Sequence, residues 1–141
     1  MNQRKKREEF LNNVPILEAL NQVERANLCE ILKRHVYKER TQLIKRGEKG
    51  DSFFILESGT AKAVGEDGVE IKFYTEGDYF GELALLEINT LRACDIFADE
   101  GSVVLSIDQE NFTRLLKPKL GNIMADAKNQ QYGESLIDAT K

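Results

Sequence analysis

The chain has 141 residues, a formal net charge of −4 and 41% hydrophobic residues. This is the size of one domain, because a chain of this length buries roughly 70% of its unfolded surface in a single core. The acidic balance argues against nucleic acid or an anionic membrane as the main partner, since either would select a basic face. No apolar run reaches membrane-spanning length, and the charged N-terminus has no hydrophobic region behind it. We therefore expect one domain over residues 1–141, without a signal peptide.

The first 34 residues carry the spacing of short helices. Apolar residues around Phe10 predict a helix that ends near Pro15, and the basic residues 4–7 indicate its solvated first turn. Asn21 followed by Glu24 is typical of a capping box that begins the next helix. That helix is expected to place one apolar face on the core, formed by Leu28, Ile31, Leu32 and His35.

Residues 35–107 show short strands separated by glycine turns, a pattern that favours a sandwich or a small barrel. The run Gly65-Glu66-Asp67-Gly68 predicts a tight hairpin between two of these strands. The predicted strands are Val36–Tyr37, Gln42–Lys45, Ser52–Glu57, Thr60–Val64, Val69–Tyr74, Ala93–Ala98 and Val103–Ile107.

Residues 108–141 are predicted to form closing helices. Asp108 is expected to be the N-cap of a helix that buries Phe112 and ends by Pro118. A further helix is expected from about Leu120, with a weakly helical and poorly anchored tail.

Residues 81–93 hold the pattern that most clearly indicates a ligand. Gly81 has no Cβ, and residues 82–86 favour a one-turn helix whose N-terminal N–H groups would attract an anion. Arg92 can bind a phosphate in a fork. Glu82 would repel an anion, so it needs another partner, and a ribose hydroxyl would be suitable. The alternative is an amphipathic turn followed by a surface arginine.

This run, with Gly-Glu-Leu-Ala-Leu before a short loop and Arg-Ala, resembles the phosphate-binding cassette of cyclic nucleotide-binding domains. Residues 44–59 are similar to the glycine-spaced strand pair of the same family. The resemblance implies an α+β fold in which helices at both ends flank an eight-stranded antiparallel jelly-roll-like β-barrel, with the cassette at 80–93. It also implies that backbone amides and Arg92 hold the cyclic phosphate, while Glu82 accepts a hydrogen bond from the 2′-hydroxyl. The implied contacts are Gly81, Glu82, Leu83, Ala84, Arg92 and Ala93.

Further residues take a role from the resemblance. It implies that Asp51 steadies the phosphate-binding arginine, although the pattern favours equally an acid that caps its own turn. It implies that Tyr132, from the closing helices, covers the purine; a frayed, exposed tyrosine is the alternative. Ala93 offers no hydroxyl to a guanine amino group, so cAMP is expected rather than cGMP. The segment 87–91 is one residue longer than usual, with Leu91 in place of a frequent proline, which leaves open a pocket for another nucleotide or a nucleoside.

The closest resemblance is to the cAMP-binding domains of protein kinase A regulatory subunits, particularly the second of the two. It implies that cAMP shifts the closing helices and that a kinase catalytic subunit is released. A cGMP-dependent kinase or a channel would be the alternative parent. His35 is the single histidine, so a metal site of clustered histidines is not expected, and no residue set supports catalysis. Cys29 and Cys94 form no CxxC pair and indicate reduced, structural thiols in a cytoplasmic protein, with a disulfide left open.

Overall fold

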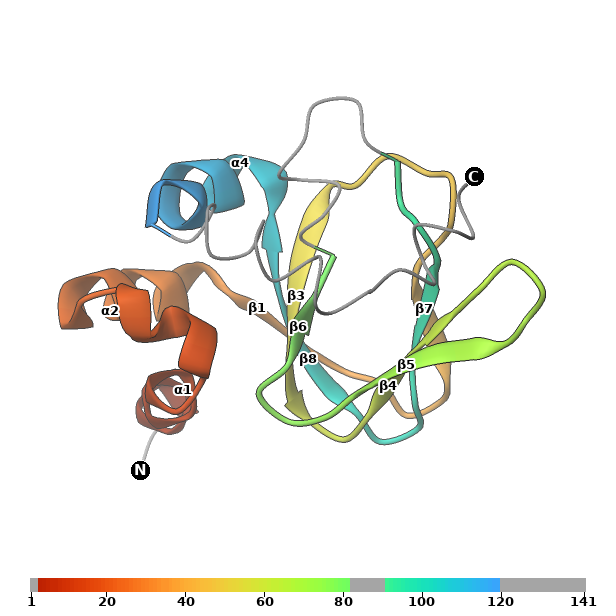
Figure 1. Ribbon diagram of the computed structural model, residues 1–141. Helices are drawn as coiled ribbons and strands as arrows, with labels where there is room; N and C mark the ends of the chain where they lie inside the picture. The colour runs from red at the N-terminus through yellow and green to blue at the C-terminus, as the bar shows by residue number, and fades with distance from the viewer. Residues whose placement is uncertain (1–2, 82–90, 120–141) are drawn as a thin grey trace.

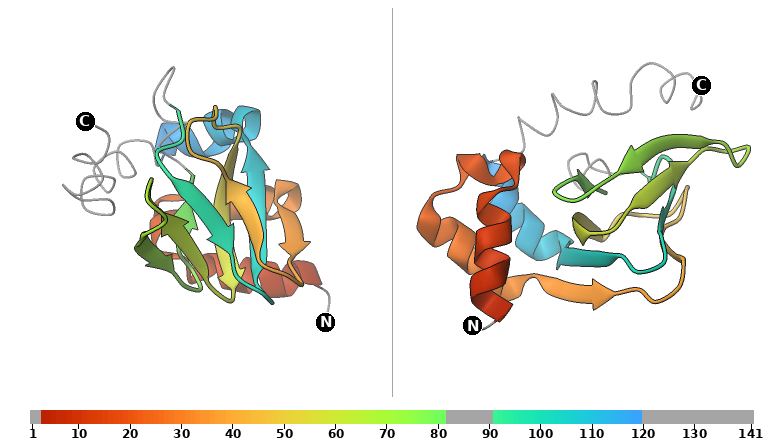
Figure 2. Two further views of the ribbon diagram at one scale, coloured as in Figure 1. Left: turned by 90° about the vertical axis from the view of Figure 1, so that its right-hand side faces the viewer. Right: turned by 90° about the horizontal axis from the view of Figure 1, so that it is seen from below.

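The computed structural model describes residues 3–81 and 91–119 and shows two facing β-sheets with the helices on one side of them (Figure 1; Figure 2). The described strands are β1 (Lys33–Val36), β2 (Thr41–Ile44), β3 (Ser52–Ser58), β4 (Ala61–Val64), β5 (Glu70–Tyr74), β6 (Tyr79–Phe80), β7 (Asp95–Ala98) and β8 (Val103–Asp108). They form two four-stranded sheets, in the orders β1-β8-β3-β6 and β2-β7-β4-β5, and every pairing is antiparallel. This confirms the jelly-roll-like arrangement. Between the described strands of the two sheets no pairing closes a barrel.

The N-terminal helices begin and end largely at the expected signals. They are α1 (Gln3–Asn12), the 3-10 helix η1 (Pro15–Ala19) and α2 (Gln22–Ile31). The capping box is confirmed, because the Glu24 N–H donates to Asn21 Oδ1 and the Asn21 N–H donates to Glu24 Oε1, each at 2.8 Å.

The predicted extension of this helix to His35 is wrong. Leu32 caps α2 in an extended conformation, and His35 lies on β1, where it pairs with Val104 of β8. Its Nε2 lies 3.0 Å from the Ser106 hydroxyl. Pairing with a strand distant in sequence has overridden the helical spacing.

The strand β3 joins the two cores because it is buried on both faces. Phe53 and Ile55 face the helices, in a cluster with Leu28 and Phe112. The alternating residues, such as Phe54, face the second sheet, in the other cluster. Cys29 belongs to the first cluster and Cys94 to the second, so both thiols are buried on opposite sides of the sheet that contains β3.

The closing helix begins as predicted, because Asp108 Oδ1 accepts from the Asn111 N–H at 2.8 Å. It consists of α4 (Gln109–Asn111), a π-helical turn η2 (Phe112–Leu116), and helical residues 117–119. The prediction that it ends by Pro118 is therefore wrong. A wide π-helical turn directly before the proline alters the carbonyl spacing with which a proline ring would clash in a regular helix.

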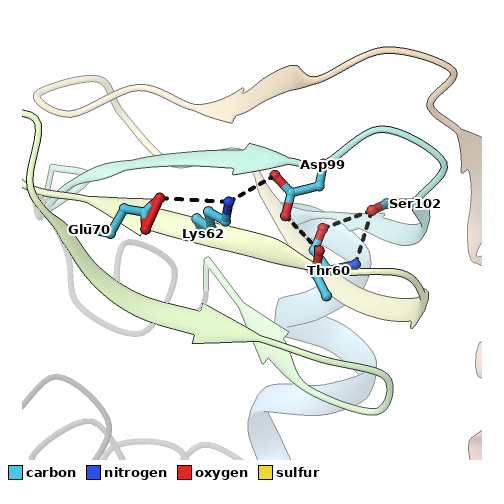
Figure 3. Close-up of polar contacts among 5 residues, drawn as sticks. All are labelled: Thr60, Lys62, Glu70, Asp99 and Ser102. Carbon is cyan, nitrogen blue, oxygen red and sulfur yellow. Dashed lines mark hydrogen bonds and ion pairs between the residues drawn. The ribbon is translucent and has the colours of Figure 1, made fainter.

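Polar contacts fix β4 to the connection between β7 and β8 (Figure 3). The buried Ser102 hydroxyl donates to the Thr60 carbonyl at 2.7 Å and accepts from the Thr60 N–H at 3.1 Å. The Thr60 hydroxyl donates to Asp99 at 2.6 Å. Lys62 lies between Asp99 and Glu70, at 3.8 and 3.6 Å. These bonds satisfy buried polar groups at the corner where the chain changes strands.

Candidate ligand-binding site

A pocket of about 470 Å³ opens beside the end of β2 and the loop that leads to β3. This volume lies within the range of about 300–1,000 Å³ that is usual for small-molecule sites. Three cationic side chains and two carboxylates line it, so the pocket has a positive balance in a chain whose net charge is −4. Its described lining residues are Leu43, Ile44, Lys45, Glu48, Lys49, Asp51 and Arg92.

Arg92 is the buried cation of this pocket, with 7% of its surface exposed. Its Nη1 donates to the Gly81 carbonyl at 2.6 Å, and its Nη2 donates to the Ser52 carbonyl at 2.8 Å. The backbone is also held, because the Arg92 N–H donates to the Glu48 carbonyl at 2.8 Å. These bonds orient a guanidinium that stays charged and that can accept an anion in its fork.

Gly81 is required by the position of Arg92. Its φ of +90° lies in the left-handed region, which favours glycine. A Cβ at this position would lie 3.0 Å from Arg92 Nη1 and 3.1 Å from the Ser52 carbonyl oxygen. A side chain would therefore be strained and would press on the guanidinium.

Asp51 lies at the same pocket, with an exposed carboxylate. Its backbone carbonyl accepts the N–H of Gln109, the first residue of α4, at 2.8 Å. The next carbonyl along the chain, that of Ser52, holds Arg92. Two consecutive peptide units at the beginning of β3 thus contact the arginine and the closing helix.

The structure brings Gly81, Arg92 and Asp51 together, and it places Ala93 half-buried beside Arg92, outside the described pocket lining. Glu82 lies outside the described residues. So do Leu83, Ala84 and Tyr132.

Sequence reasoning missed the Ser52 carbonyl and the two lysines at the rim, Lys45 and Lys49. The lysines carry a signal that was available, since they flank the predicted turn before β3. A backbone carbonyl carries no such signal, because every residue has one.

A family model, related sequences and solved structures all relate this chain to cyclic nucleotide-binding proteins. The model of the cyclic nucleotide-binding domain matches residues 34–119. A cAMP-dependent protein kinase regulatory subunit of Colletotrichum orbiculare is 43% identical over 115 residues, which is 81% of this chain and 29% of that protein. The chain therefore spans under a third of the length of this relative.

Two solved structures show the same fold. A structure of PKAR CBD2 with Sp-2Cl-cAMPS bound has a TM-score of 0.81 and 39% identity, and the match covers 96% of this chain and 90% of that one. The regulatory subunit of a cAMP-independent protein kinase A from Trypanosoma cruzi, bound to guanosine, has a TM-score of 0.81 and 26% identity. That match covers 99% of this chain and 52% of the other. Among the described helices of this chain, none is both long and apolar enough to cross a membrane.

Proposed function

The chain belongs to the cyclic nucleotide-binding domain family, and on this basis we propose that it is the cAMP-binding domain of a cAMP-dependent protein kinase regulatory subunit. The observation that carries the proposal is the buried guanidinium of Arg92, held by two backbone carbonyls at a pocket of small-molecule size. Relatives that carry this name, and a matching structure with a cAMP analogue bound, support the choice of ligand. The proposed role is binding and regulation rather than catalysis, and the proposed location is the cytoplasm.

In the proposed complex, Arg92 binds the cyclic phosphate in its fork while Gly81 lets the backbone approach. The amides of Leu83 and Ala84 complete the phosphate contacts, and Glu82 accepts a hydrogen bond from the 2′-hydroxyl.

The remaining proposed contacts concern the base and the arginine. Ala93, without a hydroxyl, favours adenine over guanine. Tyr132 covers the purine. Asp51, which lines the same pocket, limits the rotamers of Arg92 before the ligand arrives and so lowers the ordering cost of binding.

Regulation is proposed to work as a population shift. A ligand that binds one arrangement of the closing helices better than another changes their populations, and with them a surface used by a partner. The partner proposed here is the kinase catalytic subunit, which is released when cAMP binds. The contact of Asp51 with Gln109, next to the contact of Ser52 with Arg92, supports a link between the pocket and α4.

A nucleoside is the second candidate ligand. A guanosine-bound structure in the same family, at 26% identity, favours it, as does the lengthened segment 87–91. A nucleoside has no phosphate and would not use the charge of Arg92. The two candidates therefore differ in how strongly their affinity depends on this residue.

The test is calorimetric titration of the chain with cAMP, cGMP and inosine, after unfolding and refolding to remove any ligand carried through purification. Tight binding of cAMP, with weaker cGMP and no inosine, is the expected result. Binding of inosine without cAMP would replace the proposed ligand by a nucleoside. Binding of none of the three would overturn the ligand assignment.

A further inference from the structure

The turn between β2 and β3 is held by hydrogen bonds rather than by packing. Residues 45–49 are all exposed, so their side chains add little buried contact. The Glu48 N–H donates to the Lys45 carbonyl at 3.2 Å and closes a four-residue turn. Gly47, the third residue of this turn, has a φ of +87°, which favours glycine. The position of such an exposed segment depends on the bonds that it forms with its neighbours.

This turn holds the main chain of Arg92. The Arg92 N–H donates to the Glu48 carbonyl at 2.8 Å, and the Gly47 N–H donates to the Arg92 carbonyl at 2.9 Å. The other end of the residue, its guanidinium, is held separately by the carbonyls of Gly81 and Ser52. An arginine side chain has many rotamers, so both ends must be fixed if the guanidinium is to present one geometry to a ligand.

Asp95 anchors this turn to the sheet. Its Oδ1 accepts from the Arg46 N–H at 2.8 Å. Asp95 is the half-buried first residue of β7, and its main chain pairs with Val64 of β4. The pairing of β2 with β7 ends at Ile44 and Ile96, one residue before Asp95 along β7. The carboxylate therefore holds the chain at the point where it leaves the sheet.

Two consecutive N–H groups thus connect the turn to the segment 92–95. The Arg46 N–H reaches the Asp95 side chain, and the Gly47 N–H reaches the Arg92 carbonyl. The Arg46 guanidinium also pairs with Glu66 at 3.4 Å, but both side chains are exposed and water screens this pair. Asp95 is not among the described residues that line the pocket, so it can affect a ligand there only through other residues.

We propose that Asp95 is a positioning residue for Arg92. By accepting the Arg46 N–H it keeps the turn, and through the turn the main chain of Arg92, in the arrangement that binds the cyclic phosphate. A ligand that binds one arrangement loses affinity as the population of that arrangement falls. The carboxylate acts here as a hydrogen-bond acceptor, so its charge is not needed. This inference rests on the proposed function, because its readout is cAMP binding.

The experiment is calorimetric titration of the full chain with cAMP. Asp95→Ala removes the acceptor, whereas Asp95→Asn keeps an acceptor oxygen and removes the charge. Asp99→Ala is the matched control, because Asp99 follows β7 directly, is half-buried, and accepts from the Thr60 hydroxyl at 2.6 Å, away from the pocket (Figure 3). Asp95→Ala is also made in the Arg92→Ala background. Urea unfolding checks that each variant is folded.

We expect Asp95→Ala to weaken cAMP binding about threefold to tenfold, the range given by the net contribution of one hydrogen bond. Asp95→Asn and Asp99→Ala should stay within about twofold of the wild type. In the Arg92→Ala background, Asp95→Ala should change affinity by less than about twofold, because the residue through which it acts is gone. If that background binds too weakly to titrate, the comparison of Asp95→Ala with Asp95→Asn decides.

Three results would each overturn the inference: wild-type affinity in a folded Asp95→Ala, an equal loss in Asp95→Asn, or an undiminished loss in the Arg92→Ala background. Should Asp95→Ala fail to fold, Asp95→Val replaces it, because valine favours strands and also lacks an acceptor. A wild type that binds no cAMP would refute the proposed function together with this inference. A wild type that binds cAMP no better than Asp95→Ala would refute this inference alone.

Discussion

Replacing Arg92 by alanine should weaken cAMP binding while the domain stays folded. The lost interaction is a charge-assisted hydrogen-bond pair, for which a contribution of about 1.5–3 kcal/mol is usual. Since about 1.4 kcal/mol is a factor of ten, the dissociation constant should rise about 12-fold to 150-fold. Calorimetric titration at 25 °C measures this directly.

The effect on stability should be smaller than the number of lost bonds suggests. Arg92→Ala leaves the Gly81 carbonyl, whose bond to Arg92 is buried, without this donor, at a cost of about 1–3 kcal/mol. It also removes a guanidinium that is only 7% exposed, and the relief of its desolvation offsets part of that cost. Urea unfolding should therefore show a cooperative transition with a modestly lower midpoint.

Arg46→Ala is the matched control for Arg92→Ala. Arg46 belongs to the loop between β2 and β3, and its side chain forms an exposed ion pair with Glu66 at 3.4 Å. Removing it changes the net charge by the same amount and should leave affinity close to that of the wild type. A folded Arg92→Ala variant with wild-type affinity would refute the role of Arg92, whereas a wild type that does not bind cAMP would refute the ligand.

Three further predictions concern the fold and the ribose. Gly59→Ala should destabilise the domain more than Gly47→Ala. Both glycines have φ +87°, which costs a residue with a side chain about 1–2 kcal/mol, but at Gly59 a Cβ would also lie 2.5 Å from Ser102 Oγ. Equal midpoints of urea unfolding for the two variants would contradict this prediction. Burial raises the pKa of Tyr37 above 10.0, so this tyrosine ionises first in the unfolded state and the free energy of unfolding should fall above pH 10. If the free energy of unfolding fell equally steeply in Tyr37→Phe, another group would be responsible for the fall. Glu82→Ala should lose discrimination against 2′-deoxy-cAMP in competition titrations, and undiminished discrimination would make Glu82 structural.

Features set by local chemistry were predictable from the sequence. The capping box of Asn21 and Glu24 needs two side chains three residues apart, and both bonds are present. The N-cap at Asp108 is equally local. The strand predicted over Ser52–Glu57 is present as β3, and its continuous apolar run Phe53 to Leu56 fits a strand that is covered on both faces and so has no reason to alternate.

Features set by distant partners were not predictable. His35 has the spacing of the preceding helix, but it lies in a strand because it pairs with β8, some 70 residues further along the chain. The two-residue strand β6 is too short to carry any periodicity and exists only because Tyr79 and Phe80 pair with β3. Arg7 looked like part of a solvated turn, yet its Nε is buried. For His35 and for β6 the deciding contact is with a strand distant in the sequence.

The strand β3 limits how far ligand binding at Arg92 can displace the beginning of the closing helix. Its side chains are buried on both faces, so the Ser52 carbonyl that holds Arg92 is fixed in a close-packed element. The preceding carbonyl, that of Asp51, fixes the first residue of α4 to the same element. A ligand that displaced the Ser52 carbonyl would therefore also displace the beginning of α4, and it would disturb both cores in doing so.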